Sequence, residues 1–188
     1  MNYFIDNIDG VIRKRDMTRS EYRKALAAVE SGDMVRIRRG VFAKPEALLS
    51  SEVDIESIVP GSILCLYSAW SYHRLTTQIP EAFYVAVKSK RRIVVPDYPE
   101  IRLVYVSDSI LELGVITTKN AGTNNLIYDI ERSVCDAIKY RNKIGLDVMS
   151  EILTNYLSRE DRKIKKLLEY ADKLRIRTIL NKYLESRL

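Results

Sequence analysis

A capped helix followed at once by an arginine-rich hairpin limits what the start of this chain can fold into. Thr18 and Glu21 have the spacing of a capping box, in which each side chain accepts a hydrogen bond from the backbone N–H of the other residue. Apolar side chains then recur at the spacing of a helix face packed on a core, at Tyr22, Ala25, Leu26 and Val29. Gly32 follows, and glycine commonly ends a helix because it adopts the left-handed conformation without strain. The pattern predicts a helix that begins after Thr18 and ends before Gly32.

The residues after this helix predict a two-stranded hairpin. Side chains alternate with the period of a strand through Met34, Val35, Arg36, Ile37 and Arg38. Arg39 and Gly40 suit a tight turn, and residues 41–43 are predicted to form a second short strand. The stretch before the helix, residues 3–15, is less distinct and can hold one or two short helices around Gly10.

A helix and a hairpin within 50 residues give the outline of a winged helix-turn-helix, a DNA-binding domain. Such a helix buries one face and presents the other to the major groove, while arginines of the wing contact phosphates or the minor groove. A solvated helix also carries Arg and Lys opposite its core, so this alternative stays open. Net charge does not decide, because residues 1–50 and the remainder each carry +3. The predicted DNA contacts are Arg19, Ser20, Arg23 and Lys24 on the helix and Arg36, Arg38 and Arg39 in the hairpin.

Beyond the hairpin, turn-forming residues at 44–60 divide the chain into a DNA-binding domain at 1–50 and a second domain at 51–188. In the second domain an apolar stretch at 63–74 predicts a helix. Strands are predicted at 83–87, 101–106, 115–118 and 125–128, with a turn at 120–122 between the last two, and four amphipathic helices are predicted from residue 130 onward. The predicted fold class is α+β: an N-terminal winged helix-turn-helix, followed by a mixed α+β domain that ends in a bundle-like helical tail.

Two basic runs lie in the predicted second domain. The first contains Lys88, Lys90, Arg91 and Arg92, and it is either a solvated hairpin loop or a second surface for nucleic acid or a partner. The second, residues 159–166, is interpreted as the solvated face of a helix, with contact to a partner protein or RNA as the alternative. A net charge of +6 with a pI near 9.2 favours an anionic partner, but only moderately.

The sequence holds few residues suited to catalysis. His73 is the only histidine and is interpreted as structural. Asp129 and Glu131 with Lys139 form the one set compatible with a metal-dependent nuclease, although acids at a helix start also complement its dipole. We therefore expect no enzyme, no catalytic residue, no metal and no cofactor, and keep the nuclease as a rival hypothesis.

The cysteines and the N-terminus favour the cytoplasm. Cys65 and Cys135 are far apart in apolar surroundings and form no CxxC pair, so we expect two buried thiols. The first ten residues contain two acids and no long apolar run, unlike a signal peptide. No stretch approaches the length of a transmembrane helix, so no membrane partner is expected.

The hairpin and three later segments together resemble the AbiEi family of antitoxins. Residues 34–43 (MVRIRRGVFA) look like the family's wing, where an Arg-Arg-Gly-Val-Tyr run follows a short recognition helix. Residues 67–76 (YSAWSYHRLT) are similar to a Ser-Ala-Leu-x-Tyr-His-Gly-Leu-Thr stretch, and residues 130–136 (IERSVCD) to a Glu-Arg-Thr-x-x-Asp helix start. Residues 139–147 (KYRNKIGLD) also resemble a family segment. The order and spacing agree over nearly the whole chain.

This resemblance implies a transcriptional repressor that is also an antitoxin of an abortive-infection system, active in phage defence. The winged domain would repress its own operon by binding double-stranded operator DNA, with inverted repeats. The C-terminal domain would counter a cognate toxin, AbiEii, which belongs to a nucleotidyltransferase-like family. The family is called type IV, in which direct binding of the toxin is not the assumed route.

Two residues depart from the family pattern. Arg74 stands where the family often has glycine, so a helix that closes there in the left-handed region would be strained. Phe42 stands in place of tyrosine and lacks one hydroxyl. Besides the nuclease, one further hypothesis stays open: a stand-alone winged-helix regulator whose C-terminal domain senses a ligand or a partner.

Overall fold

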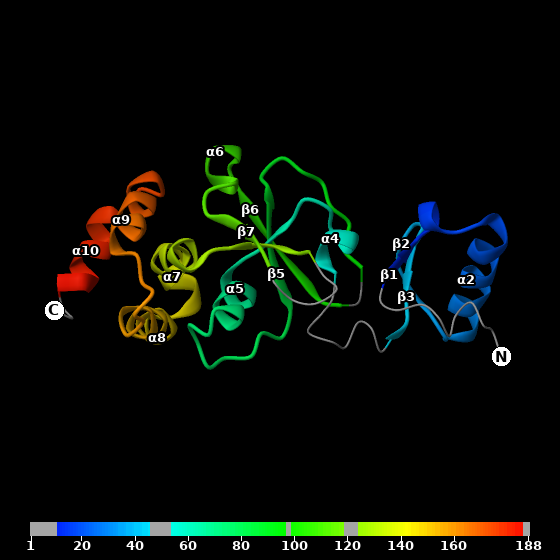
Figure 1. Ribbon diagram of the computed structural model, residues 1–188, viewed down its shortest axis with the longest axis horizontal. Coiled ribbons are helices and arrows are strands. Elements are labelled where there is room, and N and C mark those ends of the chain that lie inside the picture. Colours follow the sequence, from blue (N-terminus) through cyan, green and yellow to red (C-terminus); the bar gives the residue numbers. More distant parts are fainter. Residues whose placement is uncertain (1–10, 46–53, 97–98, 119–123, 186–188) are drawn as a thin grey trace. The chain divides into compact units, whose positions relative to one another are not determined.

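The computed structural model describes residues 11–45, 54–96, 99–118 and 124–185. The chain divides into two compact units. Unit 1 comprises residues 1–62, 92–101 and 117–125, and unit 2 comprises residues 63–91, 102–116 and 126–188. The described ranges contain eight α-helices and two β-sheets, so the predicted α+β class is confirmed (Figure 1).

Residues 11–45 of unit 1, which we call the head, form one helix beside a small sheet. The elements in chain order are β1 (Val11–Arg13), the 3-10 helix η1 (Lys14–Asp16), α2 (Arg19–Ser31), β2 (Val35–Arg38) and β3 (Val41–Ala43). Beyond the head, unit 1 also contains the short helix α4 (Ile55–Ile58). The sheet has the order β1-β3-β2, and both pairs of strands are antiparallel. The predicted hairpin is therefore present as β2 and β3, and β1 adds a third strand that was not predicted.

Helix α2 forms where local hydrogen bonds and core packing agree. The Glu21 N–H donates to the Thr18 hydroxyl at 3.3 Å, and the Thr18 N–H donates to the Glu21 carboxylate at 2.7 Å. Gly32 ends the helix with a φ of +85°. One buried apolar cluster of the head consists of Ala25, Ala28, Met34 and Phe42, with Tyr22, Leu26 and Val29 partly buried around it. The strand residues Ile37, Val41 and Ala43 are buried as well. The predicted cap, apolar face and glycine stop are confirmed.

The prediction of short helices across residues 3–15 is wrong for the part that the structure describes. Val11–Arg13 is a strand, in which Ile12 lies opposite Phe42 of β3, and only Lys14–Asp16 is helical. Residues 3–10 of that prediction lie outside the described residues. A strand of three residues is too short to show a period in the sequence, so only its partner β3 distinguishes it from a helix.

Unit 2, which we call the body, is built on a five-stranded sheet. Its strands are β4 (Ile63–Leu64), β5 (Phe83–Lys88), β6 (Ile101–Val106), β7 (Val115–Thr117) and β8 (Leu126–Tyr128), in the order β6-β5-β4-β8-β7. Strand β4 is antiparallel to β5 and parallel to β8. The helices in chain order are α5 (Leu66–Tyr72), α6 (Asp108–Leu111), α7 (Ile130–Ile144), α8 (Leu146–Leu157), α9 (Ile164–Lys173) and α10 (Arg177–Glu185).

The single helix predicted over residues 63–74 is corrected. Its first two residues form the central strand β4, and the helix α5 occupies only Leu66–Tyr72. A central strand is buried on both faces and so appears in the sequence as a short apolar run, which cannot be distinguished from a buried helix. The strands predicted at 83–87, 101–106, 115–118 and 125–128 are confirmed within one residue at each end. The turn predicted at 120–122 lies outside the described residues.

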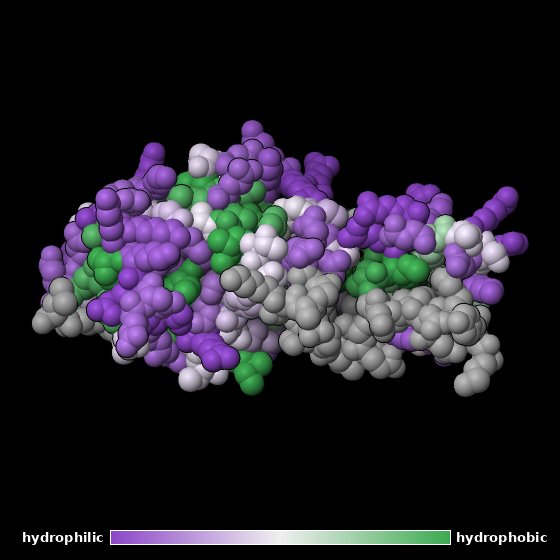
Figure 2. Space-filling view, viewed as in Figure 1, coloured by the Kyte–Doolittle hydropathy of each residue, from purple (hydrophilic) through white to green (hydrophobic). Residues whose placement is uncertain are grey.

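The helical tail predicted from residue 130 onward is present as α7 to α10. Its buried side chains share one core with α5 and the sheet, including Trp70, Tyr128, Ile138, Ile152 and Leu180. Hydrophilic side chains cover most of the face of α9 and α10 seen in Figure 2. No helix in the described ranges has both the length and the apolar character needed to span a bilayer.

Candidate nucleic-acid interface

The exposed face of α2 carries every helix residue predicted to contact DNA. Arg19, Ser20, Arg23 and Lys24 are all exposed, whereas Ala25 and Ala28 on the other face are buried. With 100° between successive residues, the four exposed side chains fall within one arc of the helix. The capping box fixes where this helix begins, and burial of Ala25 and Ala28 against the core of the head fixes the direction in which this arc points.

The hairpin adds two exposed cations of the predicted set. Arg36 on β2 and Arg39 in the turn are exposed. Arg38 belongs to β2, but its side chain lies outside the described residues. Gly40 completes the turn with a φ of +76°, a value that favours glycine. The hairpin therefore presents at least two guanidinium groups to solvent.

Lys and Arg outnumber Asp and Glu among the described residues of the head. Residues 11–45 contain ten Lys and Arg against four Asp and Glu, which gives +6, and the rest of the chain contains 21 of each. Asp6, Asp9 and Glu46, which also belong to the first 50 residues, lie outside the described residues.

Most of these cations have no carboxylate partner. Within the residues that the structure describes, no ion pair involves Arg19, Arg23, Lys24, Arg36 or Arg39. Arg13 lies 3.7 Å from the Asp54 carboxylate, and Arg15 lies 3.6 Å from that of Asp16. Because unpaired surface cations keep their full attraction for anions, this surface suits a polyanion.

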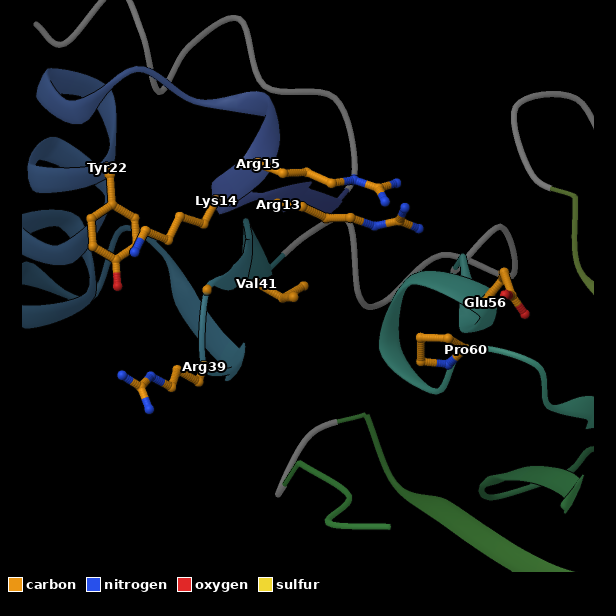
Figure 3. A pocket seen from close by; sticks show the side chains of 9 residues that line it. Arg13, Lys14, Arg15, Tyr22, Arg39, Val41, Glu56 and Pro60 are labelled. Atoms are coloured by element: carbon orange, nitrogen blue, oxygen red, sulfur yellow. The ribbon is translucent and has the colours of Figure 1, made fainter. Parts of the chain in front are cut away.

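A groove beside the hairpin turn contains three further cations that the sequence prediction missed (Figure 3). Its volume is about 660 Å³, and it is lined by Arg13, Lys14, Arg15, Tyr22, Arg39, Gly40, Val41, Glu56 and Pro60. In the sequence these cations form a basic triplet at residues 13–15, within the stretch interpreted as short helices. Strand β1 brings this triplet next to the turn.

The acids of the rival nuclease hypothesis have a different partner in the structure. Asp129 lies 2.8 Å and Glu131 3.5 Å from the Lys166 ammonium, and no ion pair joins them to Lys139 in the described residues. Asp129 also caps α7, by accepting a hydrogen bond from the Arg132 N–H at 2.8 Å. No group of three or more metal-ligating side chains comes together in the described part of the chain. These contacts favour a structural role for both acids.

His73 is buried and held on both sides. Its Nε2–H donates to the Tyr128 carbonyl at 2.7 Å, and its own carbonyl accepts from Arg159 at 3.2 Å. Burial lowers the pKa of His73 below its ordinary value. These bonds fit the structural role predicted for it.

The structure confirms the prediction for the two cysteines of the body and corrects part of the interpretation of its two basic runs. Cys65 and Cys135 are free and buried as predicted, and burial raises the pKa of both. The solvated-face interpretation of residues 159–166 is wrong for Arg159 and Lys166, because each bonds to groups of the body. In the other run, Lys88, Lys90 and Arg92 are exposed and Arg91 is partly buried, which leaves both of its interpretations open.

The exposed cations of the head and the paired charges of the body are thus the two features that bear on function. No protein-family model matches the sequence, and no curated protein matches it either. The residues themselves and their geometry must carry the functional argument.

Proposed function

We propose that the chain is a DNA-binding transcriptional regulator whose head is a winged helix-turn-helix. The observation that carries this proposal is the set of exposed cations on α2 and the hairpin, Arg19, Arg23, Lys24, Arg36 and Arg39. None of these side chains has a carboxylate partner within the described residues. A surface of this kind releases counterions when it meets the DNA backbone, which favours binding.

Helix α2 would enter the major groove and read bases. Arg19, Ser20, Arg23 and Lys24 all donate hydrogen bonds, and bidentate Arg or Lys contacts to guanine are the commonest specific contacts. Arg36 and Arg39 would bind backbone phosphates or the minor groove from the wing. The order β1-β3-β2, with α2 ahead of the hairpin, supports this assignment because it places the turn of β2 and β3 at one end of the sheet.

Binding to the promoter of the chain's own gene tests this proposal. Wild-type protein should bind a labelled promoter duplex more tightly than an unrelated duplex of equal length, measured by fluorescence anisotropy. The double variant Arg23→Ala/Lys24→Ala should lose at least about tenfold in affinity for the promoter, because each base contact is worth about 1–3 kcal/mol. Lys165→Ala/Lys173→Ala, which removes two exposed lysines from α9, is the matched control. Equal binding of both duplexes, or equal loss in the control, would contradict the proposal.

We extend the proposal, on the resemblance to AbiEi antitoxins, to a second role for the body. The chain would neutralise a nucleotidyltransferase-like toxin encoded beside it and repress their shared operon. Inducing the neighbouring gene should arrest growth, and co-expression of this chain should restore it. The variant Arg23→Ala/Lys24→Ala should still restore growth when expressed from an independent promoter, because it alters only the head.

The growth assay also separates the two regulators that remain. A harmless neighbouring gene, together with specific promoter binding, would favour the stand-alone regulator whose body senses a ligand or a partner. Toxicity that this chain does not relieve would contradict the antitoxin role and leave DNA binding untouched.

A further inference from the structure

The groove beside the hairpin turn presents cations that neither the recognition helix nor the wing accounts for. Arg13 is the last residue of β1, and Lys14 and Arg15 follow directly in η1. Arg39 in the turn lines the same groove, and Figure 3 shows its side chain pointing away from Arg13 and Arg15. Among the residues that the structure describes, four cations and one acid, Glu56, therefore line a space of about 660 Å³.

Backbone contacts hold the two sources of charge together. The Lys14 N–H donates to the Gly40 carbonyl at 2.7 Å, which ties η1 to the turn. A Cβ at position 40 would lie 3.2 Å from the Cβ of Lys14, so the absence of a side chain at Gly40 permits this approach. The basic triplet and the turn therefore keep a fixed separation, as a binding groove requires.

The cations of the groove are not all engaged in the same way. Figure 3 shows Arg13 and Arg15 extending side by side, while Lys14 points away from them toward Tyr22. Arg13 is held by the Ser57 hydroxyl at 2.5 Å and by Asp54. The Lys14 ammonium lies 4.9 Å from the centre of the Tyr22 ring, and the partner of Arg15 within the described ranges is the exposed Asp16. An exposed pair of this kind is weak, so Arg15 can exchange its partner.

The acid of the groove is itself engaged. Glu56 accepts hydrogen bonds from the Gly61 N–H through both carboxylate oxygens, at 3.0 Å and 2.8 Å. These bonds disperse part of its negative charge away from the cations. The groove therefore keeps an excess of positive charge, which selects an anion.

We propose that this groove binds phosphate groups and that their source is the sugar–phosphate backbone of DNA. Lys14, Arg15 and Arg39 would contact phosphate oxygens, and Arg13, fixed by Asp54 and Ser57, would position the wall of the groove. The proposal rests on the proposed DNA-binding function and adds to it a contact independent of sequence. Helix α2 would select the operator, and the groove would fix its register on the duplex.

The salt dependence of binding distinguishes this contact from base recognition. The variant Lys14→Gln/Arg15→Gln removes two charges, keeps side chains of similar reach and leaves α2 intact. It should weaken binding to the promoter and to an unrelated duplex by the same factor. It should also make the negative slope of log affinity against log salt concentration shallower by about 2, since each phosphate contact contributes about 0.9 to its magnitude. Lys165→Gln/Lys173→Gln on α9 should change neither quantity, and thermal melting checks that both variants fold.

The possible failures are separable. An unchanged slope, with wild-type protein still selecting its promoter, would overturn the groove as a DNA contact and leave the proposed function standing. Weakening on the promoter alone would assign Lys14 and Arg15 to base recognition and overturn the proposal as well. If wild-type protein binds neither duplex, DNA is not the source of the phosphate. In that case, pyrophosphate is titrated into the protein and the amide signals are followed by NMR. Shifts of the Lys14, Arg15 and Gly40 amide signals would support a groove that binds a free phosphate ligand, and their absence would overturn the groove as a phosphate site.

Discussion

The head and the body place their charged side chains in opposite ways. In the head, cations such as Arg23 and Arg36 are exposed and lack carboxylate partners in the described chain. In the body, Arg132 is only 1 % exposed and bonds to Asp136 at 3.1 Å. The first arrangement costs the fold little and leaves charge available for a ligand, whereas the second commits charge to the fold itself.

The cores of the head and the body also differ in how far polar groups take part in them. Buried apolar residues form the core of the head, and one of them, Phe42, packs edge-on against Tyr22 with ring centres 5.8 Å apart. In the body, the Arg132 guanidinium lies 4.2 Å from the centre of the Tyr128 ring and donates to the carbonyls of Ile110 and Leu113. Polar bonds are therefore built into the core of the body. Substitutions of buried charged residues in the body should accordingly affect stability, and substitutions of exposed cations in the head should affect ligand binding.

The largest test of this contrast is Asp136→Ala. It leaves the buried Arg132 without its carboxylate, so the free energy of unfolding should fall by about 3–5 kcal/mol in urea denaturation. Replacing both partners, as Arg132→Met/Asp136→Leu, should recover much of the loss because no unpaired charge stays buried. Arg23→Ala in the head should change stability by no more than about 0.5 kcal/mol. Similar losses in Asp136→Ala and Arg23→Ala would break the contrast.

A matched pair of glycines gives the next largest effect. Gly114 of the body has a φ of +78°, and a Cβ there would lie 2.8 Å from the Cβ of Arg132. Gly32 of the head has a φ of +85° with nothing within 4 Å of such a Cβ. Gly114→Ala should therefore cost about 3 kcal/mol from backbone strain and overpacking, and Gly32→Ala about 1 kcal/mol from strain alone. Equal losses in thermal or urea unfolding would show that packing around Gly114 is not tight.

The body tolerates backbone strain that the head avoids. The positive φ values described in the head belong to Gly32 and Gly40, whereas in the body Arg74 has a φ of +56° and Arg175 one of +58°. Both arginines are exposed, so Arg74→Gly and Arg175→Gly should each raise the free energy of unfolding by up to about 1 kcal/mol. A decrease at either position would mean that its side chain stabilises the fold more than its backbone strains it.

The smallest expected effect is a pH dependence confined to the body. Burial lowers the pKa of His73 from 6.5, so the unfolded chain takes up the proton first as the pH falls. The stability from neutral His73 is complete above about pH 6.5 and is lost as the pH falls through the folded pKa, by about 1.4 kcal/mol for each unit of pKa difference. Unfolding from about pH 8 to about pH 5 should show this decline in wild-type protein and less of it in His73→Gln, whose amide can still donate to Tyr128. The same decline in both proteins would assign it to other groups.

The backbone conformation at Arg74 is a feature that the sequence anticipated. The resemblance to the AbiEi pattern marked this position as one where glycine would be expected if a helix closed there in the left-handed region. The structure has His73 at the end of α5 and Arg74 at a φ of +56°, so that condition is met. Strand β4 shows the opposite outcome, because two apolar residues before α5 gave no sign that β5 and β8 would pair on either side of them.

The sequence by itself determined the elements whose causes are local. Helix α2 depends on bonds between Thr18 and Glu21 and on the stop at Gly32, all within a few residues, and the helices of the tail depend on apolar side chains recurring every three or four positions. Only the tertiary structure decided which charges meet. Lys166 looked solvated until α9 packed beside the start of α7 and placed it against Asp129 and Glu131. In the same way, β1 had to pair with β3 before residues 13–15 could reach the turn at Gly40. Such partners lie far apart along the chain, and no local periodicity records them.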